Sequence, residues 1–321
     1  MSGPRIVVTR RIPAPALELL DAAGTMWLNP DDRPLERAEL HRAVAGADAA
    51  VTLLHDRVDG SFLDAAGPQL RVVANVAVGF DNVDVAACTA RGVRFTNTPG
   101  VLTEATADLA FALLLMATRR LAEGERLIRA RSPWNWNMTF MLGSGIQGKT
   151  LGIVGLGQIG TATARRARAF GMKIAYTGRR RAPAELEAEL EASFLPLGEL
   201  LATADVVSLH CPLNEQTRHL IDAARLEQML PTAFLVNTTR GPVVDEGALA
   251  TALATGAIAG AGLDVFEREP EVHPGLLDLD NVVLLPHLGS ATVETRTAMA
   301  VLAARNAIAV LEGREPPTPV N

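Results

Sequence analysis

The amino-acid sequence predicts an α/β protein built around parallel sheets. Short β-rich apolar runs alternate with longer helical patterns along the chain, which is typical of βα units. The length of 321 residues is enough for two ordinary domains, and an apolar content of 48% excludes a disordered chain. A glycine-rich turn between a strand pattern and a helix pattern, at residues 155–160, is the third observation, because such turns belong to parallel α/β domains.

The first group of strand patterns precedes a long helical pattern. The expected strands are Arg5–Thr9, Met26–Leu28, Ala50–Leu54, Arg71–Val76 and Arg94–Asn97. One helix is expected from Thr103 to Arg129, with Thr103 as its N-cap and with Glu104 and Asp108 in its first turns.

An irregular stretch, SPWNWNMTFMLGSGIQGKT, follows at residues 132–150. Trp134 and Trp136 stand out, because the chain holds only three Trp and one Tyr. The stretch is either a loop that packs on its own subunit or an arm that packs on a second subunit, and the residues alone leave both open.

A second group of strand patterns begins at Leu151. Its members are LGIVG (151–155), KIAYT (173–177), FLPL (194–197), DVVSLH (205–210), AFLVNT (233–238), GAGLDVF (260–266) and NVVLLP (281–286). A last amphipathic helix is expected from Ala291 to Leu311, before a Pro-rich tail.

The turn between LGIVG and the next helix reads GxGxxG. Gly155 allows a tight turn, Gly157 lets the backbone approach a pyrophosphate at the helix N-terminus, and Gly160 lets helix and strand pack closely. The alternative is a glycine-rich βα turn that binds nothing. The strand and helix patterns on either side favour a dinucleotide site.

The strand after this helix ends in an unusual way for a dinucleotide site. An NAD-preferring site places Asp or Glu there, but this chain has Thr177 and Gly178, followed by Arg179 and Arg180. Guanidinium groups suit a 2′-phosphate, which a carboxylate would repel. The pattern therefore predicts NADP(H); the alternative is that the arginines form a solvated cluster at a helix entry.

Three later strand patterns each end in polar residues, where a doubly wound sheet binds its ligands. They supply Arg240, the carboxylates of Asp264, Glu267 and Glu269, and His287. An arginine can hold the carboxylate of a 2-oxo acid, and a histidine with a carboxylate beside it can protonate the ketone oxygen during reduction. Each residue also has an ordinary explanation, as a structural His, a solvated acid or a helix-entry Arg.

Composition limits the remaining classes. The net charge of −6 argues against a nucleic-acid surface. Cys88 and Cys211 lack CxxC spacing and the six His residues lack ligand spacing, so neither a disulfide framework nor a metal centre is expected. The N-terminus lacks a signal-peptide core and the longest apolar run, Leu109–Thr118, is too short to span a bilayer, so a cytoplasmic protein is expected.

At this point the sequence resembles the D-isomer-specific 2-hydroxyacid dehydrogenases, and among them the glyoxylate/hydroxypyruvate reductases. The motifs that carry the resemblance are NVAVGFDNVD (75–84), TNTPGVLTEATADLAFALLLMATRR (96–120), KTLGIVGLGQIG (149–160), HCPLNEQTRHLI (210–221), NTTRGPVVDEGAL (237–249), GLDVFEREP (262–270) and LLPHLGSAT (284–292).

The resemblance implies a role for particular residues. Arg240 would hold the substrate carboxylate, His287 would donate the proton, and Glu269 would be the carboxylate partner of His287. The substrate would also meet the backbone of Val78 and Gly79, and Leu54. The residues implied at the cofactor are Thr106, Gly155, Gly157, Gln158, Ile159, Gly160, Arg179, Arg180, Pro212, Thr239, Asp264 and Gly289, with His210 as a further candidate.

The resemblance also implies an architecture. Two parallel-sheet domains, one flavodoxin-like and one Rossmann-like, would flank a cleft. Residues 1–98 and 291–321 would form the discontinuous substrate domain, and residues 99–290 the NAD(P)-binding domain, with hinges near Pro99 and Ser290. A homodimer would form through the arm at 121–147, and Trp134 or Phe140 would reach the neighbouring subunit's site.

The implied activity is reduction of glyoxylate to glycolate and of hydroxypyruvate to D-glycerate, with NADPH preferred and NADH as the alternative cofactor. Other acceptors in the same class are 2-ketogluconate and phenylpyruvate. Formate oxidation is disfavoured, because formate-specific relatives carry a Gln where this chain has Glu269. A different class, the NAD(P)-sensing corepressors that share the fold, is the competing interpretation.

Overall fold

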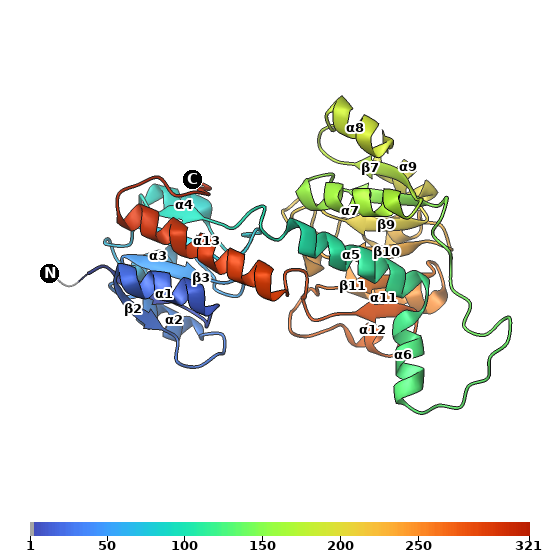
Figure 1. Ribbon diagram of the computed structural model, residues 1–321, viewed down its shortest axis with the longest axis horizontal. Helices are drawn as coiled ribbons and strands as arrows, with labels where there is room; N and C mark the ends of the chain where they lie inside the picture. Colours follow the sequence, from blue (N-terminus) through green and yellow to red (C-terminus); the bar gives the residue numbers. More distant parts are fainter. Residues whose placement is uncertain (1–2) are drawn as a thin grey trace. The chain divides into compact units, whose positions relative to one another are not determined.

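The computed structural model describes residues 3–321, and the chain divides into two compact units (Figure 1). Unit 1 consists of the chain up to Leu102 together with Ala291–Asn321, and unit 2 is Thr103–Ser290. The first boundary therefore lies between Leu102 and Thr103, whereas the sequence analysis placed it after residue 98. Along the described part of the chain, no helix combines the length and the apolar character needed to cross a membrane.

Unit 1 is built on a parallel five-stranded sheet in the order β2-β1-β3-β4-β5. Its strands are β1 (Arg5–Val8), β2 (Thr25–Leu28), β3 (Ala49–Thr52), β4 (Val72–Asn75) and β5 (Arg94–Thr96). Its helices are α1 (Ala14–Ala23), α2 (Arg37–Val44), α3 (Gly60–Ala66), α4 (Val85–Ala90) and α13 (Val293–Leu311). The C-terminal α13 thus completes a unit whose strands come from the N-terminal part of the chain.

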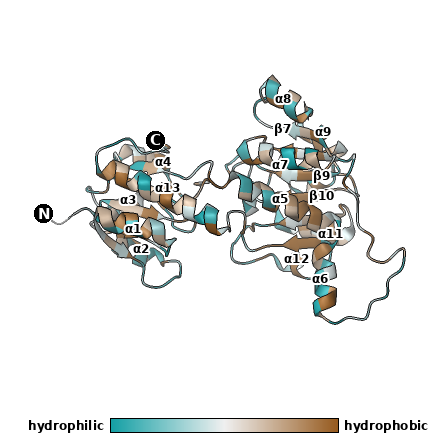
Figure 2. Ribbon diagram, in the orientation of Figure 1, coloured by the Kyte–Doolittle hydropathy of each residue, from teal (hydrophilic) through white to brown (hydrophobic). Residues whose placement is uncertain are grey.

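Alternate residues of each strand in unit 1 enter two separate apolar cores, as expected for a sheet covered on both faces. Ile6 and Val8 pack with α1 and α13, while Val7 packs with α2 and α3 on the other face. The hydropathy colouring shows the apolar residues concentrated on the strands and the inner helix faces (Figure 2).

Unit 2 holds a parallel seven-stranded sheet in the order β12-β11-β10-β9-β6-β7-β8. Its strands are β6 (Thr150–Val154), β7 (Lys173–Thr177), β8 (Ala192–Phe194), β9 (Val206–Leu209), β10 (Phe234–Asn237), β11 (Gly260–Leu263) and β12 (Val282–Leu284). Its helices are α5 (Thr103–Thr118), α6 (Leu121–Arg129), α7 (Gln158–Ala169), α8 (Ala184–Leu190), α9 (Leu197–Thr203), α10 (Ala223–Leu226), the 3₁₀ helix η1 (Gly241–Val243), α11 (Glu246–Thr255) and α12 (Pro274–Leu277).

The strand order of unit 2 is that of a Rossmann domain with one added strand. The chain starts in the middle of the sheet with β6, runs outward to β7 and β8, and then returns to β9 on the other side of β6. The order therefore reverses between β6 and β9, and ligands of such sheets bind beyond the carboxyl ends of the strands at this point.

The single helix expected over Thr103–Arg129 is wrong, because the structure contains two helices. α5 ends at Thr118 and Arg120 takes a left-handed conformation, with φ of 54°. The returning arm explains the break: the Ser144 amide donates to the Thr118 carbonyl over 2.7 Å, and a Cβ on Gly143 would lie 2.6 Å from that oxygen. α5 also begins at Thr103 itself, which makes Thr103 its first helical residue and not its N-cap.

The expected strand FLPL is displaced. β8 ends at Phe194, and Pro196 is the N-cap residue of α9. Proline has no amide hydrogen for a sheet ladder, and its fixed φ suits the entry to a helix.

Candidate functional site

The glycine turn between β6 and α7 lies at the point where the strand order reverses. Gly155 has φ of 97°, and a Cβ there would lie 2.9 Å from the backbone of His210, which follows β9. A Cβ on Gly160 would lie 2.4 Å from the Gly155 carbonyl oxygen, so this position needs glycine for packing. By contrast, a Cβ on Gly157 meets no atom within 4 Å.

The open space at Gly157 fits a bound pyrophosphate. Gly157 is the N-cap residue of the 12-residue α7, and Gln158 and Ile159 form the first turn of that helix. Their amides lack partners within the helix, and the helix dipole favours negative charge at this end. The residues present therefore fit a dinucleotide, which they would hold by backbone amides and not by side chains.

The end of β7 presents two available guanidinium groups. Thr177 is buried, while Arg179 and Arg180 are exposed, and no ion pair forms at either arginine within the described chain. Arg181 differs, because its Nε lies 2.8 Å from Glu187 Oε1. Arg179 and Arg180 thus differ from Arg181 in having no ion pair with another described residue.

His210 follows β9 directly, and its backbone lies against Gly155 of the glycine turn. Its Nε2 lies 2.9 Å from Ser208 Oγ, whereas its buried Nδ1 has no partner in the structure. Burial lowers the pKa of His210 to about 4, so the ring is neutral at physiological pH. Pro212 lies beyond it in an exposed loop, where its carbonyl accepts from Thr217 Oγ1 over 2.6 Å.

The loop after β10 is built on Asn237, a residue that the sequence analysis missed. Asn237 is 1% exposed, and its Oδ1 accepts from the amide and the hydroxyl of Thr239 over 3.0 and 2.7 Å. Its Nδ2 donates to the Arg240 carbonyl over 3.0 Å. The signal was present in the sequence, because a buried Asn as the last residue of a parallel strand is placed to shape the loop that follows.

Gly241 joins the β10 loop to the β11 loop. A Cβ on Gly241 would lie 1.8 Å from the carbonyl carbon of Phe266 and 2.3 Å from the amide nitrogen of Glu267. Only glycine allows the two backbones to approach this closely. Arg240 is therefore held beside the loop that carries Glu269, and its charge contributes to lowering the pKa of Glu269.

Asp264 organises the loop that carries His287. Its carboxylate is 1% exposed and accepts from the amides of Leu288 and Gly289 over 2.6 and 2.8 Å. The Asp264 carbonyl accepts from the amide of His287 over 2.8 Å. Burial raises the pKa of Asp264, and the two amide hydrogen bonds oppose that rise only in part.

His287 and Glu269 form a hydrogen-bonded pair. His287 Nδ1 lies 2.8 Å from Glu269 Oε2, and the Phe266 amide donates to the other oxygen, Oε1, over 3.0 Å. Burial tends to raise the pKa of Glu269, but the hydrogen bond and charge of His287, the Phe266 amide and the charge of Arg240 together lower it. The carboxylate is thus ionised at neutral pH, and it orients the imidazole with Nε2 directed away from it.

The first turn of α5 connects the glycine turn to this pair. Thr103 Oγ1 donates to Gln158 Oε1 over 3.4 Å, and Thr106 Oγ1 donates to the Gly289 carbonyl over 3.0 Å. One helical turn therefore contacts both the start of α7 and the loop after β12. The predicted cofactor residues and the His287–Glu269 pair lie at the same edge of the same sheet.

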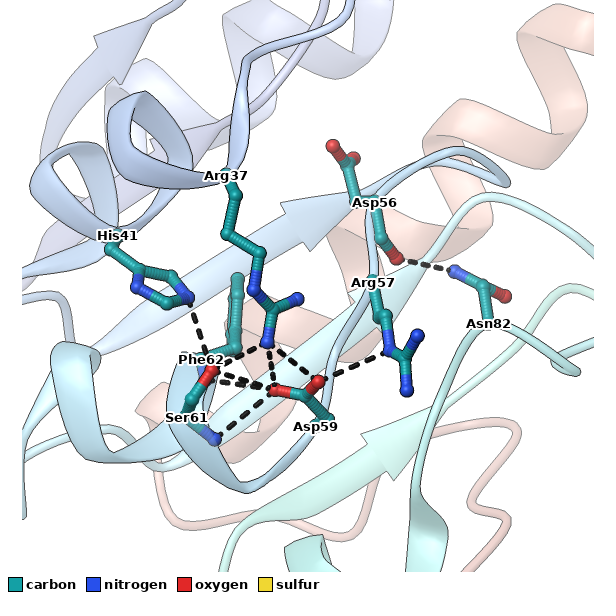
Figure 3. A network of polar contacts seen from close by, with 8 residues as sticks. All are labelled: Arg37, His41, Asp56, Arg57, Asp59, Ser61, Phe62 and Asn82. Carbon is teal, nitrogen blue, oxygen red and sulfur yellow. Dashed lines mark hydrogen bonds and ion pairs between the residues drawn. The ribbon is translucent and has the colours of Figure 1, made fainter.

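The remaining predicted residues, Leu54, Val78 and Gly79, belong to unit 1. Leu54 lies in the turn after β3, and Val78 lies in the loop after β4, where its carbonyl accepts from Asn97 Nδ2 over 2.9 Å. Both loops follow neighbouring strands of one parallel sheet. They lie beside a polar network that includes Asp56 and Asn82 (Figure 3).

A hollow of about 340 Å³ on unit 1 has different chemistry. Two of its arginines are engaged with the protein itself: Arg33 donates to both carboxylate oxygens of Glu39, and Arg5 donates to the carbonyls of Ala43 and Ala45. In the part of the chain that is described, no group of His, Cys, Asp and Glu side chains is arranged to hold a metal ion.

The strand order and the glycine turn define the class of dinucleotide-binding α/β proteins. A family model described as "D-isomer specific 2-hydroxyacid dehydrogenase, NAD binding domain" matches residues 111–289. The chain belongs to the D-isomer specific 2-hydroxyacid dehydrogenase family, and it is an NAD(P)-dependent enzyme of that family.

Full-length relatives agree with this assignment. The glyoxylate reductase of Thermococcus onnurineus is 49% identical over 323 residues, which cover 99% of this chain and 96% of that protein. A crystal structure of a Thermus thermophilus protein superposes with a TM-score of 0.92 at 46% identity, covering 99% of this chain and 100% of the other. The NADPH-dependent glyoxylate/hydroxypyruvate reductase of Sinorhizobium meliloti, solved with NADP and malonate, gives a TM-score of 0.87 at 38% identity, covering 99% and 97%.

Proposed function

We propose that this enzyme reduces glyoxylate and hydroxypyruvate to glycolate and D-glycerate, with NADPH as the preferred cofactor. The observation that carries the proposal is the contact of α5 with both the glycine turn and the loop of His287. It joins a dinucleotide-binding turn to an imidazole–carboxylate pair within one unit. The names of the similar enzymes from Thermococcus onnurineus and Sinorhizobium meliloti support the choice of substrate.

The residues of the chain divide the chemistry among them. When bound, the reduced nicotinamide supplies the hydride. His287 donates a proton from Nε2 to the ketone oxygen, while Glu269 at Nδ1 holds the ring in place. Arg240 holds the substrate carboxylate.

The preference for NADPH rests on Arg179 and Arg180. Both are exposed at the end of β7, where an NAD-preferring site would place an acid, and Arg181 is already paired with Glu187. Replacing Arg179 and Arg180 by Ala together should weaken NADPH far more than NADH. The matched control is Arg181→Ala, which should leave the preference unchanged.

We also propose that two copies of the chain associate through the arm at 121–147. α6 has no buried residue, and the arm exposes Ile128, Trp136, Met138 and Leu142 at 58%, 71%, 78% and 64%. A run of exposed apolar side chains of this size favours a protein partner. We propose a second copy of this chain as that partner, because most soluble oligomers are symmetric assemblies of identical chains.

The test is a spectrophotometric assay of reduced-cofactor oxidation, run with NADPH and NADH against glyoxylate, hydroxypyruvate, 2-ketogluconate and phenylpyruvate. The first two acids should be the best substrates. His287→Ala should lower turnover by roughly 100-fold or more, because a general acid contributes about that much. Undiminished turnover in this variant would refute the mechanism, and a higher kcat/KM for 2-ketogluconate or phenylpyruvate would replace the substrate.

A further inference from the structure

One amide side chain in unit 1 connects the two loops that the family resemblance implies at the substrate, the loop of Leu54 and the loop of Val78 and Gly79. Asn82 Nδ2 donates to the Leu53 carbonyl over 3.1 Å and to the Asp56 carbonyl over 2.8 Å. These carbonyls stand at the two ends of the turn that carries Leu54. Figure 3 shows the amide of Asn82 directed at the backbone of Asp56.

Hydrogen bonds of the buried Asp56 also close the Leu54 turn. Asp56 is 4% exposed, and its Oδ2 accepts from the Leu53 amide over 2.8 Å and from Thr9 Oγ1 over 2.5 Å. The Asp56 amide in turn donates to the Leu53 carbonyl over 3.1 Å. The turn is thus closed by several hydrogen bonds, and Asn82 adds two more.

Asn82 also belongs to the loop that carries Val78 and Gly79. Its carbonyl accepts from the Val58 amide over 2.9 Å, so the backbone at Asn82 runs beside the exit of the Leu54 turn. Its Oδ1 lies 3.5 Å from Nδ2 of Asn75, the fully buried last residue of β4. The same side chain is therefore anchored at the start of its own loop.

We infer that Asn82 is a positioning residue that determines which 2-oxo acids the enzyme accepts, according to the substituent on their carbonyl carbon. This inference rests on the proposed function. If Val78 and Gly79 hold the carboxylate and Leu54 faces the substituent on the carbonyl carbon, Asn82 determines the spacing between the two. Glyoxylate has only hydrogen as that substituent, so its binding does not depend on the position of Leu54. Hydroxypyruvate carries a hydroxymethyl group and does depend on it.

The test compares kcat/KM for hydroxypyruvate with kcat/KM for glyoxylate in Asn82→Asp. The new carboxylate has nearly the same shape but cannot donate to either carbonyl. The ratio of the two values should fall about fivefold or more, since the lost hydrogen bonds are those that order the turn.

Asn29→Asp is the matched control. Asn29 is also a buried amide of unit 1 that donates to two backbone carbonyls, those of Thr9 at 2.9 Å and Arg33 at 3.0 Å. It should lower the melting temperature in a similar way but leave the substrate ratio unchanged. If Asn82→Asp does not fold, Asn82→Ser replaces it, because Ser removes the amide without adding a charge.

The outcomes separate the two proposals. An unchanged or increased ratio in the Asn82 variant, or the same decrease in Asn29→Asp, overturns the role of Asn82 while the wild-type activity stands. A wild-type protein that reduces neither acid overturns the proposed function, and the inference about Asn82 with it.

Discussion

At the residue scale, the chemistry depends on single side chains whose partners come from distant parts of the chain. Glu269 is the clearest case, because its two oxygens are used separately, one by the Phe266 amide and one by His287. The pair is predictable from the position of both residues after strand ends and from the family resemblance. The structure adds the geometry and the contribution of Arg240 to the charge balance.

Glu269→Gln should lower turnover in the reductive direction. A neutral amide still contacts the imidazole but removes the carboxylate charge beside the proposed proton donor. Steady-state kinetics with glyoxylate, measured for both proteins, check this. Turnover at the wild-type level would contradict it.

The same substitution should change the pH dependence of stability. The pKa of Glu269 is lowered in the folded protein, so this carboxylate stabilises the fold above its unfolded pKa. That contribution is lost as the pH falls through the folded pKa. The difference in free energy of unfolding between wild type and Glu269→Gln, from urea titrations, should therefore be largest at neutral pH and shrink in acid. A difference that is constant with pH would show that the lowered pKa of Glu269 does not contribute to the stability of the fold.

Gly241→Ala should destabilise the protein by about 3 kcal/mol and reduce turnover, because the added Cβ would clash with the backbone of Phe266. The loop carrying Arg240 would be pushed away from the loop carrying Glu269. Chemical denaturation and steady-state kinetics measure the two effects. Gly256→Ala serves as the control, since a Cβ there meets no atom within 4 Å and only its φ of 73° opposes the change. Wild-type turnover in Gly241→Ala would refute the positioning role.

At the element scale, the β6–α7 turn is the element whose glycines can be tested one by one. Gly157→Ala should leave the melting temperature of the cofactor-free protein nearly unchanged, because the new Cβ enters open space. It should weaken NADPH binding strongly, because the proposed pyrophosphate site occupies that space. Calorimetric titration with NADPH and a thermal melt without it measure both.

Gly160→Ala gives the opposite pattern and acts as the comparison. Its Cβ would lie 2.4 Å from the Gly155 carbonyl oxygen, so the cofactor-free fold itself should lose about 1–3 kcal/mol. If both variants lowered stability equally, the distinction between a packing glycine and a ligand glycine would be wrong.

Element boundaries were predictable where local patterns decide them. The GxGxxG turn and the strands on either side of it follow from glycine spacing and apolar runs. The break between α5 and α6 was not predictable, because the 103–129 pattern reads as one helix. The Ser144 amide takes the Thr118 carbonyl, and this contact depends on how the arm returns to the sheet.

At the scale of the whole molecule, association through the arm is the property to test. The wild-type protein should have twice the 34.0 kDa mass of one chain in solution. Ile128→Glu combined with Trp136→Glu should yield the single-chain mass, because both side chains are exposed apolar groups of the arm. Analytical ultracentrifugation gives these masses. Val293→Glu, at an 80% exposed position on α13, controls for added charge, and an unchanged mass in the double variant would contradict the arm as the interface.

The sequence by itself determined the fold class, the dinucleotide turn and the set of polar residues at strand ends. These depend on periodicity, glycine spacing and the rule that parallel strands end at one edge of a sheet. Only the tertiary structure decided that Asn237 builds the Arg240 loop, that Gly241 fits against Phe266 and that Asn82 joins two loops. The physical reason is range: local patterns specify the conformation of neighbouring residues, whereas these hydrogen bonds and close contacts form between segments that only packing brings together.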